Sequence, residues 1–190
     1  MNVFRARILG IYALALTMGL NSCTTAEKPM TSNKSAKEIF GNPEYRAISF
    51  GGYRGKNIEE QPSIPQLKED LKIMSAMGIK ILRTYNLQLP HALNVLKAIR
   101  ELKQEDASFE MYVMLGAWMD CFGALTNEQP DHSRESEENN TSEIEKAVRY
   151  ANEFPDIVKI IAVGNEAMVH WASSYFVHPS VILKYVNYLQ

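Results

Sequence analysis

Cysteine is scarce in this sequence, and basic residues are not in excess over acidic ones. Its 190 residues include only two cysteines, Cys23 and Cys121, so a disulfide framework is excluded and a hydrophobic core must stabilise the fold. The net charge is −2, whereas a nucleic-acid-binding surface needs an excess of basic side chains. We therefore expect no nucleic-acid partner.

The common motifs of metal and dinucleotide sites are also missing. No Gly-x-Gly-x-x-Gly turn follows the first predicted strand, and neither His-Glu-x-x-His nor Cys-x-x-Cys spacing occurs. His132 lies near Asp131 and Glu135, but this segment is polar throughout, which is typical of a solvated loop. We expect neither a cofactor nor a metal ion.

A continuous apolar run is found near the start of the chain. Arg5 and Arg7 precede Ile8–Leu20, which is too short to span a bilayer as a mature helix. The run ends in Leu-Asn-Ser-Cys, which resembles a bacterial lipoprotein box, although asparagine is unusual there. We predict a lipoprotein-type signal peptide over 1–22, lipidation of Cys23, and an exported protein anchored to a membrane at the periplasmic or cell surface. Secretion without lipidation is the alternative.

The segment after the signal is polar. Residues 23–40 contain few apolar side chains, a composition that suits a flexible linker between an anchor and a folded domain. We therefore predict a linker over 23–40 and a folded domain over 41–190.

Apolar patterning in the domain alternates between strands and helices. The predicted strands are Tyr45–Tyr53, Ile79–Asn86, Phe109–Trp118 and Ile157–Glu166. The predicted helices contain Leu67 to Met74, Leu93 to Ile99, Ile144 to Ala151, and Val181 to Leu189. The acidic segment 127–141 has no apolar periodicity, and we expect it to be a solvated loop.

This order of elements predicts an α/β fold with parallel strands and right-handed crossovers. An open doubly wound sheet and a closed barrel both use this order, but the missing dinucleotide turn weakens the first. A (β/α)8 barrel needs ~250 residues, whereas four strand–helix units are present here and the chain ends inside a predicted helix. We therefore expect the truncated N-terminal half of a (β/α)8 TIM barrel.

Aromatic, amide and charged residues gather where the predicted strands end. Functional side chains of a parallel barrel collect at this rim. Aromatic rings stack on sugar rings, and arginine and asparagine donate hydrogen bonds to sugar hydroxyls. The candidate sugar-binding residues are Tyr53, Arg83, Tyr85, Trp118, Asn165 and Trp171.

Glu166 is the candidate catalytic residue. It follows the apolar run Ile160–Val163 and Gly164, so we expect a partly desolvated carboxyl group that can hold a proton near neutral pH. Glycoside hydrolysis needs such a carboxylic acid to protonate the leaving oxygen. A structural acid at the start of a helix is the alternative.

Three motifs resemble glycoside hydrolase family 17, a β-1,3-glucanase family of retaining barrel enzymes. Val163-Gly164-Asn165-Glu166 resembles the family's fourth-strand motif, Arg83-Thr84-Tyr85 its second-strand motif, and Gly51-Gly52-Tyr53 its first-strand ending. The resemblance implies that Glu166 is the acid/base, Asn165 orients the sugar, Arg83 steadies the nucleophile and Tyr85 lines the cleft. It also implies a nucleophilic Glu on a seventh strand, which this chain lacks.

The resemblance predicts a retaining hydrolase of β-glucan, with β-1,3-glucan as the expected substrate. The isolated chain would be inactive without the nucleophile. A β-glucanosyl transferase would use the same Glu166 with a sugar acceptor in place of water. A non-catalytic carbohydrate-binding surface lipoprotein is the second class of function. Linkage, product size and oligomeric state stay open.

Overall fold

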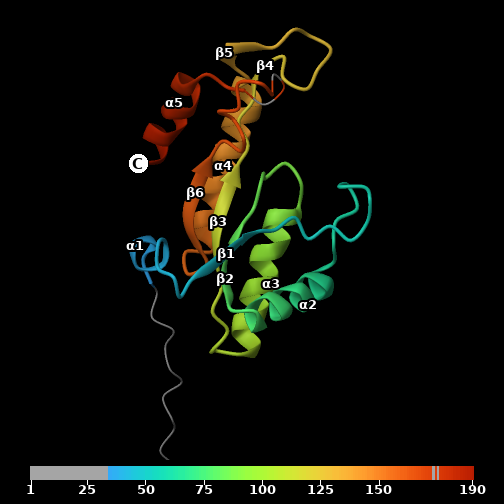
Figure 1. The fold of residues 1–190 in the computed structure, drawn as a ribbon, viewed down its shortest axis with the longest axis vertical. Coiled ribbons are helices and arrows are strands. Elements are labelled where there is room, and N and C mark those ends of the chain that lie inside the picture. The colour runs from blue at the N-terminus through green and yellow to red at the C-terminus, as the bar shows by residue number, and fades with distance from the viewer. Residues whose placement is uncertain (1–33, 173, 175) are drawn as a thin grey trace, which may run out of the picture.

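The computed structural model describes residues 34–172, 174 and 176–190, and their centre is a four-stranded parallel sheet (Figure 1). Its strands are β1 (Arg46–Ser49), β2 (Ile79–Arg83), β3 (Tyr112–Ala117) and β6 (Val158–Val163). They pair in the order β1-β2-β3-β6, so spatial order follows chain order without reversal. The predicted α/β fold with parallel strands is confirmed, although each strand is shorter than expected.

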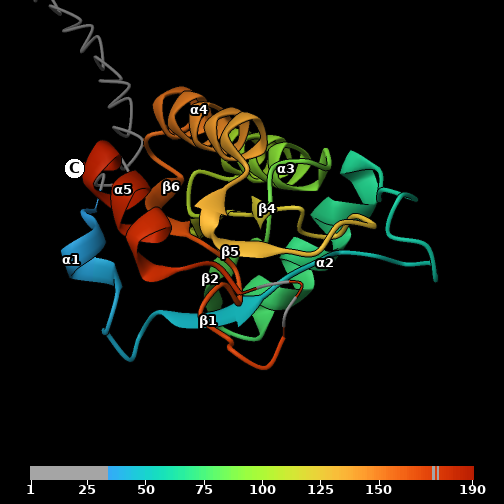
Figure 2. The ribbon, with the colours of Figure 1, turned by 90° about the horizontal axis from the view of Figure 1, so that it is seen from above.

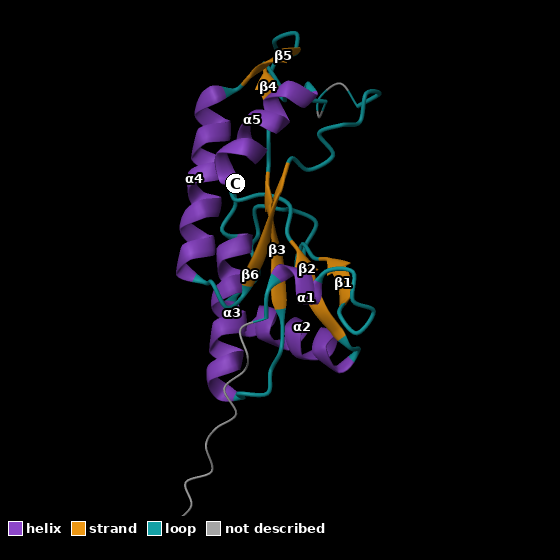
Figure 3. Ribbon diagram, turned by 90° about the vertical axis from the view of Figure 1, so that its left-hand side faces the viewer, coloured by secondary structure: helices purple, strands orange, loops and turns teal. Residues whose placement is uncertain are grey.

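Four helices pack against the sheet. They are α2 (Ile64–Ala76), α3 (His91–Glu105), α4 (Glu137–Glu153) and α5 (Pro179–Leu189). Figure 3 shows α3 and α4 along one side of the strands. Apolar residues of all four helices join β3 in one buried core, as their helical spacing predicts. The predicted stripe Leu67, Leu71 and Met74 is buried in that core.

A short helix, α1 (Ala36–Ile39), lies on the other side of the sheet from α2 and α3 (Figures 1 and 2). Its Ile39 is fully buried and packs with Tyr45, Ile81 and Tyr112 in a separate cluster. The prediction of a flexible linker is therefore wrong for residues 34–40. Two adjacent apolar residues, Ile39 and Phe40, pack this segment against the fold, and two adjacent residues are too few for a periodic signal.

The prediction of a solvated loop over 127–141 is wrong. Strand β5 (Asp131–Glu135) pairs antiparallel with β4 (Cys121–Phe122), and α4 begins at Glu137. Glu137 and Glu138 occupy the first turn, where negative charge is favoured by the helix dipole. The buried face of this helix starts with Asn140 and Glu143, so its first two turns lack an apolar stripe.

Gly116 lets β2 and β3 meet closely below the carboxyl ends of the strands. A Cβ atom at this position would lie 2.2 Å from the Thr84 carbonyl oxygen. The Gly116 amide donates to the Thr84 hydroxyl oxygen at 3.0 Å, and Thr84 is fully buried. No side chain fits there without moving the backbone of the β2–α3 connection.

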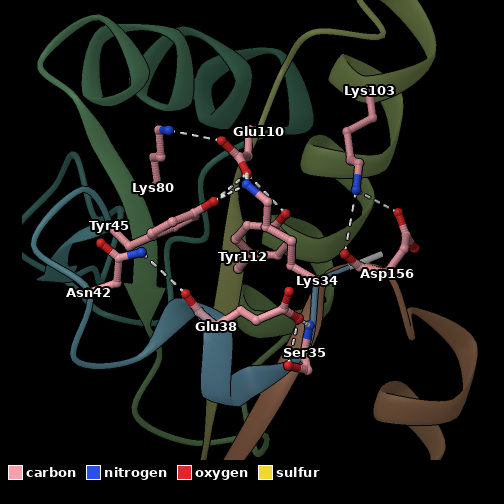
Figure 4. A network of polar contacts seen from close by, with 10 residues as sticks. All are labelled: Lys34, Ser35, Glu38, Asn42, Tyr45, Lys80, Lys103, Glu110, Tyr112 and Asp156. Atoms are coloured by element: carbon pink, nitrogen blue, oxygen red, sulfur yellow. Dashed lines mark hydrogen bonds and ion pairs between the residues drawn. The ribbon is translucent and has the colours of Figure 1, made fainter. Parts of the chain in front are cut away.

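A polar cluster lies at the opposite end, where the strands begin. Figure 4 shows the Glu110 carboxylate surrounded by donors. It accepts hydrogen bonds from Lys34, Lys80, Tyr45 and Tyr112 at 2.9–3.1 Å. Burial alone would raise the pKa of Glu110, but these hydrogen bonds outweigh it and lower the pKa to about 2. We call these five residues the Glu110 cluster; Lys34 in it ties the segment before α1 to the sheet.

The predicted signal peptide, Cys23 and the first part of the linker lie outside the described residues. Within 34–190, apart from residues 173 and 175, no helix has the length and apolar character to cross a bilayer.

Candidate active site at the carboxyl ends of the strands

The predicted site residues lie at or just after the carboxyl ends of the four parallel strands. Arg83 is the last residue of β2, and Tyr85 follows two residues later. Trp118 directly follows β3, and Tyr53 lies in the connection after β1. Asn165, Glu166 and Trp171 lie in the connection after β6. Parallel pairing brings these positions to one edge of the sheet, which we call the rim.

Arg83 joins the connections after β2 and β6. Its guanidinium donates a hydrogen bond to the Asn165 side-chain oxygen at 2.5 Å, across 82 positions of sequence. Asn165 is buried, with 7% of its surface exposed, so this charge-assisted bond fixes the amide. The guanidinium also lies 5.7 Å from the Tyr85 ring centre. Arg83, Tyr85 and Asn165 therefore form one contiguous group.

Glu166 follows this group in an unusual backbone conformation. Its φ is +53°, in the left-handed region that side chains other than glycine rarely adopt. Gly164 has a φ of +84°, so the chain turns sharply as it leaves β6. The Glu166 side chain is exposed, which makes the expectation of partial desolvation wrong in this structure. The apolar run before it ends at Val163, and Glu166 lies beyond that run in an exposed bend.

The two tryptophans differ in their surroundings. Trp118 is half-buried, and its indole N–H donates to the Asp120 carboxylate at 2.7 Å. Burial raises the pKa of Asp120, while the hydrogen bonds from Trp118 and Asn139 oppose that rise. Trp171 is 88% exposed. The structure therefore holds Trp118 in place and leaves Trp171 as an open aromatic surface.

His91 at the start of α3 is a rim residue that the sequence analysis missed. Its ring lies 5.7 Å from the Tyr53 ring and 5.6 Å from Phe50, and it is 4% exposed. Burial lowers the pKa of His91 to about 4, and its Nε2 lies within 3.0 Å of where a Gly52 Cβ would be. Gly52 (φ +66°) therefore lets the chain pass over the imidazole toward Tyr53.

The β4–β5 pair supports the connection that contains Glu166. The His132 ring nitrogen Nδ1 contacts the Phe176 carbonyl oxygen at 2.7 Å, and the His178 amide donates to the His132 carbonyl oxygen at 2.9 Å. The Cys121 sulfur lies 3.5 Å from the same Nδ1. Burial raises the pKa of Cys121, so its thiol is a poor nucleophile. Among the residues that the structure describes, no group of three or more His, Cys, Asp or Glu side chains could hold a metal ion.

Comparisons with known proteins found similarity to a solved structure. No family model and no curated protein matches the chain. Among solved structures, the chain is similar to an endo-laminarinase from Formosa Hel1_33_131, with 65% sequence identity and a TM-score of 0.81. The match covers 83% of this chain and 40% of that chain, so this sequence spans about two-fifths of the length of the endo-laminarinase.

Proposed function

We propose that this chain is the acid/base-bearing half of a (β/α)8-barrel glycoside hydrolase that acts on β-glucan. The observation that carries the proposal is the hydrogen bond between Arg83 and Asn165, which joins two strand ends next to Glu166. The sequential order of the parallel strands supports a barrel, because a doubly wound sheet reverses its order. The endo-laminarinase, 65% identical over the matched region, supports β-1,3-glucan as the substrate.

We assign the reaction to the retaining class of family 17. The protonated Glu166 gives its proton to the glycosidic oxygen while a second carboxylate attacks the anomeric carbon and the bond to the leaving sugar breaks. The Glu166 carboxylate then takes a proton from the water that displaces this nucleophile. The two carboxyl groups of a retaining enzyme are ~5–5.5 Å apart. The second would come from a seventh strand in the rest of the barrel.

The exposure of Glu166 sets a condition on this mechanism. A carboxyl group holds its proton near neutral pH when water is removed from it. The bound glucan and the remaining barrel wall would cover Glu166 and supply that desolvation. The strained backbone at Glu166 is consistent with a functional position, since such conformations gather at active sites.

The test measures binding and hydrolysis separately. We expect the chain from Thr24 onward to bind β-1,3-gluco-oligosaccharides in calorimetry, and Arg83→Ala to weaken binding about tenfold or more. In the whole enzyme, Glu166→Gln should retain binding and reduce hydrolysis by about 10²–10⁴-fold. Glu145→Gln, an exposed position on α4, is the control. Near-normal hydrolysis by Glu166→Gln would refute the assignment.

Two other functions share these rim residues. A β-glucanosyl transferase would yield longer oligosaccharides from the same assay. A non-catalytic surface lipoprotein would bind glucan and release no product. Asp120 is a second carboxylate near the rim, but it is buried and accepts the Trp118 indole N–H, so it is not free to act as the nucleophile; this favours the non-catalytic candidate for the isolated chain. For each of these functions we propose export through the signal at 1–22 and membrane attachment at Cys23. The test compares radiolabelled lipid incorporation in the wild type, which should be labelled, with that in Cys23→Ser, which should not.

A further inference from the structure

Two buried polar residues of α4 lie directly beneath the rim. Asn140 is fully buried and Glu143 is 2% exposed. They belong to the first two turns of α4, and neither is among the residues that the mechanism uses. A buried carboxylate is costly unless its oxygens are hydrogen-bonded, so its partners indicate what it holds.

Glu143 bridges the connections after β2 and β3. One carboxylate oxygen, Oε1, accepts the Leu87 amide at 2.6 Å and the Trp118 amide at 2.9 Å. Leu87 lies two residues after Tyr85, so the bridge joins the backbone segments that present both aromatic rings. Burial raises the pKa of Glu143, and its two amide hydrogen bonds oppose that rise.

Asn140 fixes the next backbone segment. Its side-chain oxygen accepts the Asp120 amide at 2.8 Å, and its Nδ2 donates to the Asp120 carbonyl oxygen at 2.9 Å. The Asp120 carboxylate in turn accepts the Trp118 indole N–H at 2.7 Å. Trp118 is thus held at its main chain by Glu143 and at its ring by Asp120, which Asn140 orients.

We propose that Glu143 and Asn140 are positioning residues that hold the Trp118 indole as a preset platform for a glucose ring. The ligand class rests on the proposed function. A side chain that is already ordered loses less conformational entropy when a ligand stacks on it, so such a platform binds more tightly than a mobile ring. The same bridge keeps the Tyr85 segment in register with Trp118.

The experiment compares Glu143→Ala with Glu143→Gln and with Glu145→Ala in the chain from Thr24 onward. Glu145 is exposed on the same helix and is the matched control. Glu143→Gln keeps an oxygen acceptor at Oε1. The readouts are hydrogen exchange of the Leu87 and Trp118 amides, iodide quenching of Trp118 in a Trp171→Phe background, and calorimetric affinity for β-1,3-gluco-oligosaccharides.

We expect Glu143→Ala to speed exchange of both amides at least tenfold, to increase quenching of Trp118, and to weaken glucan affinity about three- to tenfold. Glu143→Gln should restore most of each signal, and Glu145→Ala should match the wild type. If Glu143→Ala does not fold, Asp120→Ala removes the carboxylate that accepts the Trp118 indole and the Asn139 side chain, and leaves Glu143 unchanged. It should increase quenching of Trp118 and weaken glucan affinity in the same direction.

The outcomes separate this proposal from the proposed function. Unchanged exchange and quenching in Glu143→Ala, or a mobile Trp118 with unchanged glucan affinity, would overturn the positioning role. Failure of Glu143→Gln to restore the signals would do the same. A wild-type chain that binds no glucan, while Glu143→Ala still frees Trp118, would overturn the proposed function and the ligand assigned to the platform, and leave only the structural bridge.

Discussion

At the amino ends of the strands Glu110 accepts hydrogen bonds from four side chains, whereas at the carboxyl ends Glu166 and Trp171 are exposed. The Glu110 cluster satisfies its carboxylate within the fold, and this lowers the pKa of Glu110 to about 2. At the rim, by contrast, Glu166 has a left-handed backbone. The difference agrees with the proposed function, in which the amino ends of the strands contribute stability and the carboxyl ends contact the glucan.

The largest expected change in stability comes from Gly116→Ala, which disrupts the close packing of β3 against the backbone that leads from β2 to the rim. The added methyl group would lie 2.2 Å from the Thr84 carbonyl oxygen, a backbone atom that cannot turn away. We expect the free energy of unfolding to fall by about 3 kcal/mol, measured by urea denaturation. Glucan affinity of the folded fraction should also fall, because the Tyr85 segment must shift. A loss below about 1 kcal/mol would show that the two strands can separate without cost.

His91→Phe tests whether the buried imidazole adds acid sensitivity to the rim. The folded state lowers the pKa of His91 to about 4 from 6.5, so the unfolded chain binds the proton more readily between those values. Stability is therefore lost as the pH falls from 6.5 toward 4. We expect the wild type to lose about 2 kcal/mol between pH 8 and pH 4.5 that His91→Phe retains.

His91→Phe should be no less stable than the wild type at pH 8. The imidazole nitrogen Nε2 is buried without a hydrogen-bond partner in the described structure, and phenylalanine would fill the same space between Phe50 and Tyr53. Parallel pH profiles of the two proteins between 6.5 and 4 would contradict the assigned burial.

Glu110→Gln weakens the Glu110 cluster and should lower stability without changing glucan binding. The folded pKa of about 2 lies below the ordinary value of 4.5, so Glu110 stabilises the fold above pH 4.5, and this contribution is lost as the pH falls toward 2. The side chain is 25% exposed, and solvent screening limits the loss to about 1–2 kcal/mol at pH 7. Thermal unfolding of the wild type and Glu110→Gln at pH 7 and pH 2.5 measures this difference in stability, which should be smaller at pH 2.5.

The control for Glu110→Gln is Glu44→Gln, an exposed carboxylate near the start of β1. Glu44→Gln should leave stability within about 0.5 kcal/mol of the wild type. Both variants should bind glucan as the wild type does. Weakened binding in Glu110→Gln with unchanged stability would invert the comparison between the two ends of the sheet.

Much of this arrangement was predictable because it follows from periodicity. The stripe Leu67, Leu71 and Met74 predicted α2, and four apolar strands predicted a parallel sheet with Arg83 and Asn165 at one edge. The direct bond between those two residues was not predictable, because strand registers set it across 82 positions. The parallel-sheet rule gives the edge where residues meet and leaves their distances undetermined.

Two of the failures, the start of α4 and His91, share a physical cause, which is burial of polar groups. Asn140 and Glu143 stand where an amphipathic helix normally has apolar residues, so α4 was expected to begin later than it does. His91 is buried by rings from another connection, which no local pattern reveals. The prediction for Glu166 was wrong in the opposite sense. The apolar run before it predicted a desolvated carboxyl group, but the side chain is exposed in a bend that contains two left-handed residues, Gly164 and Glu166.

The smallest expected change in stability is that of Glu166→Gly, which should affect hydrolysis far more than folding. The left-handed conformation of Glu166 costs about 1–2 kcal/mol for a residue with a Cβ atom, and glycine adopts it freely. Glycine also makes the unfolded chain more flexible, which offsets about 0.4–1 kcal/mol of the gain. Glu166→Gly should therefore raise the free energy of unfolding by about 0.5 kcal/mol while abolishing hydrolysis in the whole enzyme. Leu125→Gly, at φ +56° between β4 and β5, should be stabilised similarly and keep its activity. If Glu166→Gly is instead destabilised by 1 kcal/mol or more, the Glu166 side chain stabilises the fold. The left-handed conformation at the rim would then not be a loss of stability that function requires.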